Sequence, residues 1–303
     1  MRARIRAAAA CLLVWASGIA YAQEIDYAAL YKKTAPAVVY VAAFIDETPA
    51  RSGAGFVVAA DGLVLTSRHV VWDEARDRPA GRVLVFLKPE RVTGRSQDDL
   101  VRRYDAVIFK EDKNQDLALL KLRDAPANLA TLAFAPEGSG QVGAPTAAIG
   151  HPVGGSRWSL TTGRISGEIA DLEGVRGRGA WQMETAINPG NSGGPLLDKD
   201  GGVLGVNSVI VRKAPDGTVV EGVAFAVRSE AATAWLKAAQ AAFVTASAAP
   251  AAAAPTTPVA ATPVKAGPAK PGTVFAPSQL EKTKRELEGL EEEMRDEVRR
   301  RNP

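Results

Sequence analysis

The sequence predicts an all-β fold built from barrels, and three observations favour this class. Short apolar runs recur along the chain between residues 35 and 227, and glycine, asparagine, aspartate or proline separates them. There are roughly a dozen of these runs with little helical periodicity between them, as in barrels made of many short strands. Glycine is abundant, at 28 residues, which suits a chain in which many turns join strands.

The expected strands form two successive sets along the chain. The first set comprises the apolar runs 37–43, 55–59, 63–66, 82–87 and 117–122. The second set comprises the runs 147–150, 158–162, 202–211 and 222–227. We expect a short helix over 25–33 before the first strand, and an amphipathic helix over 230–243 after the last one.

The segment 1–22 has the features of a secretory signal peptide. Three arginines precede an apolar stretch over 7–20, and Ala20-Tyr21-Ala22 supplies the small-x-small pattern that predicts cleavage before Gln23. An uncleaved membrane anchor is the alternative, but about 14 apolar residues are fewer than the roughly 20 that span a bilayer. The sequence therefore predicts a periplasmic or secreted protein without a stable membrane span.

The basic character of the whole sequence belongs to this predicted signal. The chain carries 37 basic and 34 acidic residues, and cleavage would remove three arginines and no acid, which leaves 34 of each. A balanced mature chain gives no reason to expect a nucleic-acid partner. Cleavage would also remove Cys11, the only cysteine, so packing alone would hold the barrels.

Two segments of different composition follow the predicted closing helix. Residues 245–277 are rich in alanine and proline and lack acidic residues, which predicts an extended, semi-rigid linker. Residues 278–303 predict a charged helix, because Ser278 and Glu281 have capping-box spacing. Apolar residues then recur every seven positions, at Leu280, Leu287 and Met294. This helix is either a short coiled coil or docking helix for a homo-oligomer or another partner, or a solvated and partly frayed helix.

The stretch Asn188-Pro189-Gly190-Asn191-Ser192-Gly193-Gly194 is the most informative about chemistry. A nucleophilic hydroxyl needs a sharp glycine-rich turn to project from the backbone, and such a turn uses backbone angles that glycine adopts most easily. The same turn would aim the amides of Gly190 and Ser192 into one pocket, as an oxyanion hole requires. The alternative is an ordinary Asn-Ser-Gly turn.

A nucleophilic serine needs a base and an orienting carboxylate, and each has one favoured candidate. Of the two histidines, His69 follows an apolar strand, whereas His151 precedes a proline and is expected to be a surface turn residue. Asp116 begins the apolar run 116–122, where a lone acid would ordinarily be a hairpin-turn residue. In the predicted triad, His69 takes the proton of Ser192, and Asp116 holds the imidazole in the right tautomer.

These motifs resemble those of a known protease family. In the order His, Asp, Ser, the stretches Thr-Ser-Arg-His-Val-Val, Asp-Leu-Ala-Leu-Leu-Lys-Leu and Gly-Asn-Ser-Gly-Gly-Pro-Leu are similar to those of the bacterial HtrA/Deg family of trypsin-like proteases. The resemblance covers about residues 26–242. It implies two six-stranded antiparallel β-barrels within a protease domain over 23–244, with the triad in the cleft between them and no metal or organic cofactor.

Several features depart from the family pattern. The family usually carries one or two PDZ domains after the protease, and residues 245–303 leave no room for one. The segment 89–103 is an extra charged insertion, and His151 replaces a residue that is usually not basic. Asn191, before the nucleophile, cannot form the ion pair that activates digestive zymogens, so no activation cleavage is expected.

The substrate pocket is expected to be small and uncharged. Ala186, six residues before the nucleophile, corresponds to the base of the specificity pocket in trypsin-like enzymes, with Ile187 beside it. An uncharged base cannot pair with arginine or lysine, so we expect a preference for small or medium aliphatic P1 side chains. Phe225, Ala226 and Val227 are expected to offer a strand edge to the substrate.

The sequence thus predicts an exported serine endopeptidase that cleaves unfolded or exposed polypeptide segments through an acyl-enzyme, as in protein quality control. A different class of function is the alternative: a non-catalytic, protease-shaped scaffold that binds or chaperones unfolded chains. The presence of His69, Asp116 and Ser192 together favours the enzyme.

Overall fold

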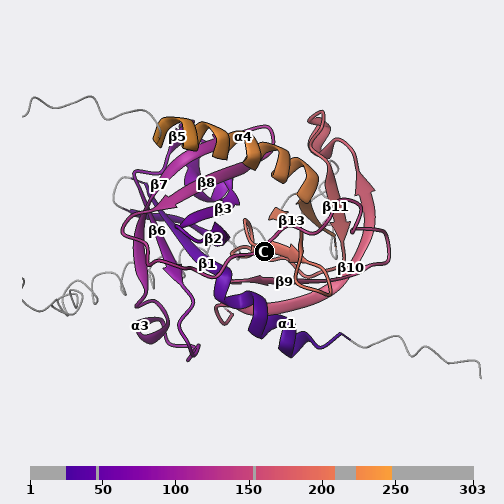
Figure 1. Cartoon of the computed structure of the whole chain (residues 1–303), viewed down its shortest axis with the longest axis horizontal. Coiled ribbons are helices and arrows are strands. Elements are labelled where there is room, and N and C mark those ends of the chain that lie inside the picture. Colours follow the sequence, from indigo (N-terminus) through magenta and orange to yellow (C-terminus); the bar gives the residue numbers. More distant parts are fainter. Residues whose placement is uncertain (1–24, 46–47, 153–154, 209–222, 248–303) are drawn as a thin grey trace, which may run out of the picture.

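A computed structural model describes residues 25–45, 48–152, 155–208 and 223–247 (Figure 1). The predicted signal peptide 1–22, the linker 245–277 beyond residue 247 and the C-terminal helix 278–303 lie outside the described residues. Within the described part of the chain, no helix is both long enough and apolar enough to cross a membrane.

Two closed antiparallel barrels of six strands each make up the molecule, which confirms the predicted fold class. The first barrel has the order β1-β2-β3-β8-β7-β6. Its strands are β1 (Val38–Ile45), β2 (Thr48–Ala59), β3 (Leu63–Ser67), β6 (Arg82–Leu87), β7 (Arg103–Asp112) and β8 (Leu117–Leu122). A short ribbon of β4 (Trp72–Asp73) and β5 (Arg78–Pro79) stands beside it.

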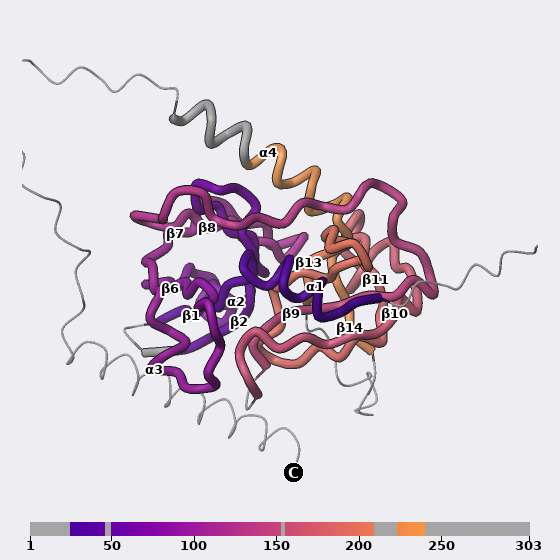
Figure 2. Tube along the Cα trace, turned by 60° about the horizontal axis from the view of Figure 1, so that its bottom comes forward, coloured from indigo at the N-terminus to yellow at the C-terminus, as the bar shows by residue number. Residues whose placement is uncertain are grey.

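The second barrel has the order β10-β11-β14-β13-β12-β9. Its strands are β9 (Pro145–Gly150), β10 (Ser159–Ile169), β11 (Ala180–Met183), β12 (Pro195–Leu197), β13 (Val203–Ser208) and β14 (Ala224–Arg228). The two barrels lie side by side, the first coloured indigo to magenta and the second pink to orange (Figure 2).

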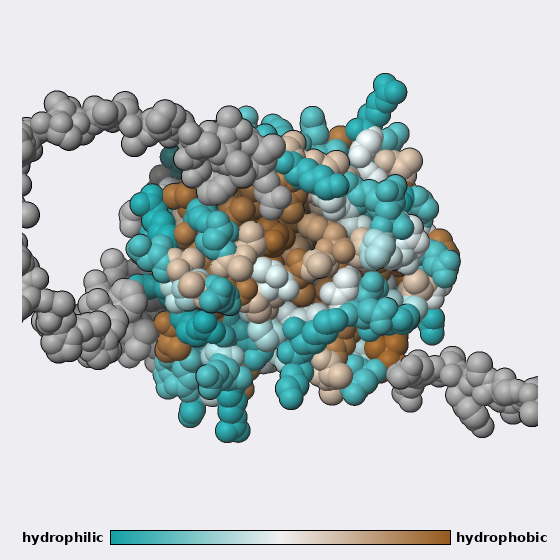
Figure 3. All heavy atoms as spheres, viewed as in Figure 1, coloured by the Kyte–Doolittle hydropathy of each residue, from teal (hydrophilic) through white to brown (hydrophobic). Residues whose placement is uncertain are grey.

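Helices lie around the barrels and do not form their cores. They are α1 (Tyr27–Thr34), α2 (Arg68–Val71), α3 (Ser96–Asp99) and α4 (Ser229–Ser247), with 3-10 turns at η1 (Ala35–Ala37) and η2 (Leu172–Gly174). The helix α4 packs buried Leu236 and Ala239 against Leu63 and Leu119 of the first barrel. It also contacts β13 and β14 of the second barrel, so it crosses both (Figure 1). In the space-filling view, apolar surface gathers beside this helix within a hydrophilic rim (Figure 3).

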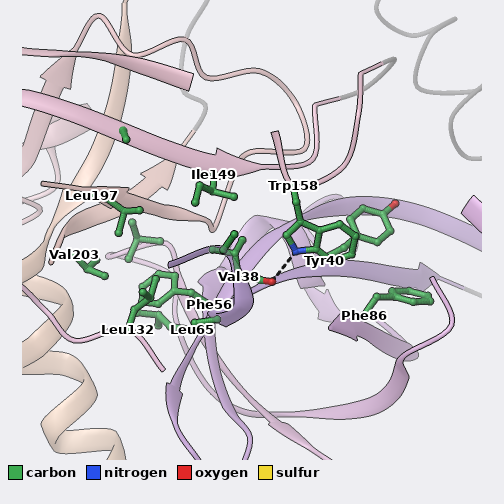
Figure 4. Close-up of a cluster of buried hydrophobic side chains, with 14 of the residues drawn as sticks. Val38, Tyr40, Phe56, Leu65, Phe86, Leu132, Ile149, Trp158, Leu197 and Val203 are labelled. Atoms are coloured by element: carbon green, nitrogen blue, oxygen red, sulfur yellow. Dashed lines mark hydrogen bonds between the residues drawn. The ribbon is translucent and has the colours of Figure 1, made fainter. Parts of the chain in front are cut away.

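Strand β1 shows why the two barrels pack into one body. All but its last residue are buried, and alternate side chains point to opposite faces. Val39 and Val41 belong to an apolar cluster drawn from the first barrel, whereas Val38 and Tyr40 belong to a cluster drawn from both barrels. The indole of Trp158 donates to the carbonyl of Val38 at 2.8 Å and so links the barrels directly (Figure 4).

Most predicted elements are confirmed, with differences that have physical causes. The runs 82–87 and 117–122 are strands with those bounds, and the expected closing helix is α4. The strand β7 was not predicted, because its apolar run 106–109 is short and flanked by charged residues, and its side chains are only partly buried or exposed. The charged insertion 89–103 connects β6 to β7 and contains the single turn α3.

Candidate active site

His69 lies on the single helical turn α2, immediately after the strand β3 ends. The next two residues of the turn, Val70 and Val71, are buried in the apolar cluster of the first barrel and anchor it. The side chain of His69 itself is 30% exposed. Burial of its neighbours thus holds an accessible imidazole at the end of a rigid strand.

The preceding residue, Arg68, fixes α2 from the other side. Its guanidinium is almost fully buried, lies over the ring of Trp72 and contacts three carboxylates. These are Glu74 at 2.5 Å, Glu111 at 2.5 Å and Asp77 at 3.2 Å. Its backbone amide donates to the carbonyl of Asp116 at 3.0 Å, which ties α2 to the start of β8.

Asp116 forms two separate hydrogen bonds with His69. The imidazole Nδ1 lies 2.8 Å from the carboxylate Oδ2, and the backbone amide of His69 donates to Oδ1 at 3.0 Å. The backbone of Asp116 has φ of 55°, a left-handed conformation that aspartate tolerates better than most residues. This conformation turns the carboxylate away from β8 and toward α2.

The surroundings of Asp116 hold its carboxylate in the charged form. Burial opposes ionisation, but the charge of His69, the hydrogen bonds from its ring and amide, and the charge of Arg178 together hold the pKa of Asp116 below its usual value. Oδ2 also accepts a hydrogen bond from the Ser208 hydroxyl at 3.1 Å. The carboxylate is therefore a permanent anion beside the imidazole at neutral pH.

Ser192 lies in a turn that both barrels hold in place. Its carbonyl accepts from the amide of Ala54 in β2 at 2.8 Å. The neighbouring Gly193 donates to the carbonyl of Asn207 in β13 at 2.8 Å, and Asn207 donates back to Gly194 at 2.8 Å. The turn is thus clamped between one strand of each barrel.

Gly193 shows why the turn needs glycine. Its φ is 83°, and a Cβ atom there would collide with the hydroxyl of Thr66 and the carbonyl of Ala54. The same Cβ would lie only 2.7 Å from the amide nitrogen of Ser67, two residues before His69. The nucleophile turn therefore lies directly against the end of β3.

The structure brings the three predicted triad residues to this junction, but the hydrogen bond between Ser192 and His69 is not formed. The His69–Asp116 hydrogen bonds are formed, whereas among the described residues no hydrogen bond links the hydroxyl of Ser192 to the imidazole of His69. Catalytic hydrogen bonds are often long before substrate binds, so this geometry is compatible with a resting site.

The oxyanion-hole prediction concerns the amides of Gly190 and Ser192. In the described part of the chain, neither amide donates to another backbone group. Gly190 has φ of 98°, and its carbonyl accepts from the amide of His151 at 3.2 Å. A Cβ atom at Gly190 would collide with the carbonyl of His151, so the two loops are in close backbone contact.

His151 is not the surface turn residue that the sequence suggested; that prediction is wrong. The side chain is buried between Tyr40 and Trp158, with ring centroids 5.1 and 4.8 Å away. Its Nδ1 accepts from the amide of Trp158 at 3.2 Å. Burial, with a smaller contribution from the charge of Arg157, lowers the pKa of His151 to about 3. It is therefore neutral at physiological pH.

The predicted substrate-pocket residues divide into two groups. Ala186 is exposed, and its carbonyl accepts from the hydroxyl of Thr161 at 3.0 Å, whereas Ile187 is buried in the second barrel. The strand edge predicted at Phe225, Ala226 and Val227 is wrong, because β14 pairs with β11 on one side and β13 on the other. No free edge remains there.

Two residues at the site were missed by sequence reasoning. Ser208 at the end of β13 binds Asp116, and Arg178 from the loop before β11 places its guanidinium Nη2 3.6 Å from the same oxygen. Polar Asn207 and Ser208 inside an apolar run were a usable signal, since buried polar residues in a strand need partners. Arg178 had no such signal, because it lies in a glycine- and arginine-rich loop.

The chain is similar to known serine peptidases. Residues 53–206 match the model of the trypsin-like peptidase domain. Serine protease HTRA1 of Xenopus tropicalis is 35% identical over 209 residues, which cover 66% of this chain and 40% of that protein. A probable periplasmic serine endoprotease DegP-like of Chlamydia muridarum is 38% identical over 165 residues, which cover 52% of this chain and 28% of that protein.

A solved structure is similar as well. The HtrA-type protease AlgW with a tripeptide has a TM-score of 0.57 and 28% identity, over 70% of this chain and 62% of that one. The chain spans less than half the length of the two relatives above.

Proposed function

This chain belongs to the trypsin-like peptidase family, and from that premise we propose that it is an exported serine endopeptidase that cleaves unfolded or exposed polypeptide segments. The observation that carries the proposal is the His69–Asp116 pair, which is joined by two hydrogen bonds. It lies beside the turn of Ser192, which backbone hydrogen bonds to both barrels hold in place. Relatives and structural neighbours named as HtrA-type serine proteases support it.

The proposed mechanism uses His69 as a proton carrier. When substrate binds, the imidazole Nε2 takes the hydroxyl proton of Ser192 while Oγ attacks the scissile carbonyl. The imidazolium keeps its Nδ1–H on Asp116, whose permanent charge stabilises it. The same proton then passes to the leaving amine, and an acyl-enzyme remains on Ser192. Water, deprotonated by His69, then attacks the acyl-enzyme; the bond from Ser192 Oγ to the acyl group breaks, Oγ takes the proton back from the imidazolium, and the second product leaves.

The developing oxyanion would bind in the turn of the nucleophile. The amides of Gly190 and Ser192 have no other backbone partner in the described part of the chain, so they are available to donate to it. Their positions are held by the close backbone contact with His151 and by the hydrogen bond of Ser192 to Ala54. Donors that are fixed before the reaction stabilise the transition state more than mobile ones do.

Two further parts of the proposal concern substrate and location. The exposed, uncharged Ala186 favours small or medium aliphatic P1 side chains over arginine and lysine. The predicted signal peptide 1–22 and the name of the chlamydial relative, a probable periplasmic endoprotease, favour export to the periplasm or beyond.

The direct test is digestion of casein by the full chain and by its Ser192→Ala variant. We expect the variant to lose on the order of 10⁴ to 10⁶ in turnover. Edman sequencing of the secreted protein would find Gln23 at its amino terminus. Equal digestion by the two proteins would refute the assignment of the nucleophile.

A non-catalytic scaffold that binds unfolded chains is the second candidate, and one observation favours it: the missing hydrogen bond between Ser192 and His69. A fluorophosphonate probe separates the two functions, because it labels only an activated serine. Labelling of Ser192 in the presence of an unfolded substrate supports the enzyme. An absence of labelling with every substrate, together with prevention of aggregation, supports the scaffold.

We also propose that the segment 278–303 makes a homo-oligomer contact or docks a partner. Sedimentation of the full chain and of a chain ending at Ala249 tests this. Unchanged oligomeric mass would exclude the segment as the cause of self-association.

A further inference from the structure

The oxygen of Asp116 that binds the imidazole also faces a second cation. Arg178 brings its guanidinium Nη2 to 3.6 Å from Oδ2, and its side chain is only 6% exposed. Arg178 belongs to the second barrel's connection between β10 and β11, whereas Asp116 belongs to the first barrel. The ion pair therefore crosses the junction at which the triad is assembled.

The loop that carries Arg178 is held by its own hydrogen bonds. The carboxylate of Asp171 accepts from the amide of Gly177 at 2.7 Å. The amide of Leu172 donates to the carbonyl of Arg178 at 2.9 Å, and that of Arg178 donates to Val175 at 3.0 Å. Leu172 is buried, which anchors the loop. These bonds thus fix the backbone that carries the guanidinium of Arg178.

The outer side of the guanidinium is paired with a surface carboxylate. Its Nη1 donates to Glu173 at 2.8 Å, and the side chain of Glu173 is 43% exposed. A series of groups of alternating charge therefore runs from the surface to the imidazole, through Glu173, Arg178, Asp116 and His69.

Three other arginines lie near this junction, and one of them, Arg51, donates to the backbone carbonyl of His69 at 3.3 Å, whereas the other two bind carboxylates. On α2, Arg68 is paired with Glu74, Asp77 and Glu111. On β14, whose Arg228 packs against Gly179, the guanidinium is paired with Glu168 and Glu230. Arg178 differs from all three arginines because it shares a buried carboxylate with the imidazole of His69.

We propose that Arg178 is a positioning residue that divides the charge of Asp116 between itself and His69, and so keeps the imidazole unprotonated at lower pH. A cation near an imidazole disfavours its protonated form, and a carboxylate shared with an arginine stabilises an imidazolium less. Glu173 offsets the charge of Arg178 and weakens the effect. The proposal rests on the proposed function only for its consequence in catalysis, which is activity that persists to lower pH.

The kinetic test compares the pH profile of kcat/KM in four proteins. Arg178→Met should move the acidic limb to higher pH by about half a unit to one unit. Glu173→Gln should move it by less and toward lower pH, and Arg178→Lys should preserve most of the original profile. Arg176→Met is the matched control, because it removes an exposed arginine from the same loop and should leave the limb unchanged. A loss of kcat without a shift of the limb in Arg178→Met would mean a merely structural role and would overturn the proposal.

A second measurement does not depend on turnover. The chain has only two histidines, so the NMR spectrum of histidine-labelled full-length protein contains two imidazoles, and His151→Gln identifies the signal of His151. The pH at which the His69 signal titrates should rise in Arg178→Met and fall in Glu173→Gln. Identical titration curves in wild type, Arg178→Met and Glu173→Gln would overturn the inference. Shifted curves in a protein without peptidase activity would refute the proposed function and leave the inference standing. If Arg178→Met fails to fold, the Glu173→Gln curve decides alone.

Discussion

His69 binds both carboxylate oxygens of Asp116, one through its ring at 2.8 Å and the other through its backbone amide at 3.0 Å. The ring bond sets the tautomer, and the amide bond sets the position of the α2 turn relative to the carboxylate. The side chain of Asp116 therefore fixes both the imidazole ring and the backbone of His69. The arrangement is rigid, because Asp116 begins β8 and His69 follows β3, and these two strands are paired.

Replacing the carboxylate should disable the base without moving the backbone. Asp116→Asn keeps a residue type that tolerates left-handed φ, but the amide favours the wrong imidazole tautomer. We expect kcat to fall by about 10⁴. Peptide hydrolysis measured beside Asp112→Asn provides the control, since Asp112 is an acceptor in the preceding turn that does not contact His69. Retention of a tenth or more of wild-type activity by Asp116→Asn would contradict the assignment.

Removing the Ser208 hydroxyl should have a smaller effect on the same carboxylate. The bond from Ser208 Oγ to Asp116 Oδ2 is one of several, and a hydrogen bond to a charged group contributes about 1.5 to 3 kcal/mol at most. Ser208→Ala should therefore lower kcat about tenfold and leave KM nearly unchanged. Ser67→Ala is the comparison, because it removes a buried hydroxyl that donates to the carbonyl of Asn207 and, within the described residues, forms no hydrogen bond with Asp116. An equal loss in both variants would indicate general loosening of the junction.

Burial of His151 should make the fold sensitive to mild acid. In the native state the pKa of His151 is about 3, whereas the unfolded side chain titrates near 6.5. Below about pH 6.5 the unfolded state therefore takes up a proton that the native state refuses, and stability is lost progressively until about pH 3.

His151→Gln keeps an acceptor for the Trp158 amide and does not titrate. Between about pH 7 and about pH 5, the free energy of unfolding of the wild type should fall by about 2 kcal/mol more than that of the variant. Urea unfolding at the two pH values measures this difference. The contributions of the other titrating groups are the same in both proteins and cancel in the comparison. Parallel losses in the two proteins would refute the buried, neutral assignment.

The buried guanidinium of Arg68 should contribute more to stability than an arginine in an exposed ion pair. Arg68→Met removes the shared partner of three carboxylates and the cation above Trp72. We expect it to lower the free energy of unfolding by about 1.5 to 3 kcal/mol, because the buried position loses its charge-assisted hydrogen bonds while the three partly exposed carboxylates stay in contact with water. Arg95→Met, at an arginine whose side chain is 70% exposed and whose partner Asp98 is also partly exposed, should cost less than about 1 kcal/mol. Urea unfolding at neutral pH checks both, and a similar cost at the two positions would contradict the argument.

Much of the fold and the triad could be predicted because their signals are local. The run 117–122 became β8 with the same bounds, since a short run with five apolar residues after a turn favours a buried strand. Gly193 needs positive φ because of its own turn, so its residue type indicated the geometry. By contrast, the strands β11 and β12 have four and three residues, too few for a periodic pattern to appear.

The sequence by itself determined the fold class, the strand-rich segments and the identity of the three residues at the candidate site, because turn chemistry and apolar runs act between near neighbours in the chain. Only the tertiary structure decided that β14 has no free edge, that His151 is buried against Tyr40, and that Arg178 reaches Asp116. Strand pairing, burial and ion pairing depend on which distant segments meet. Asp116 and Arg178 are 62 positions apart in the sequence, and no local pattern in the chain indicates their contact.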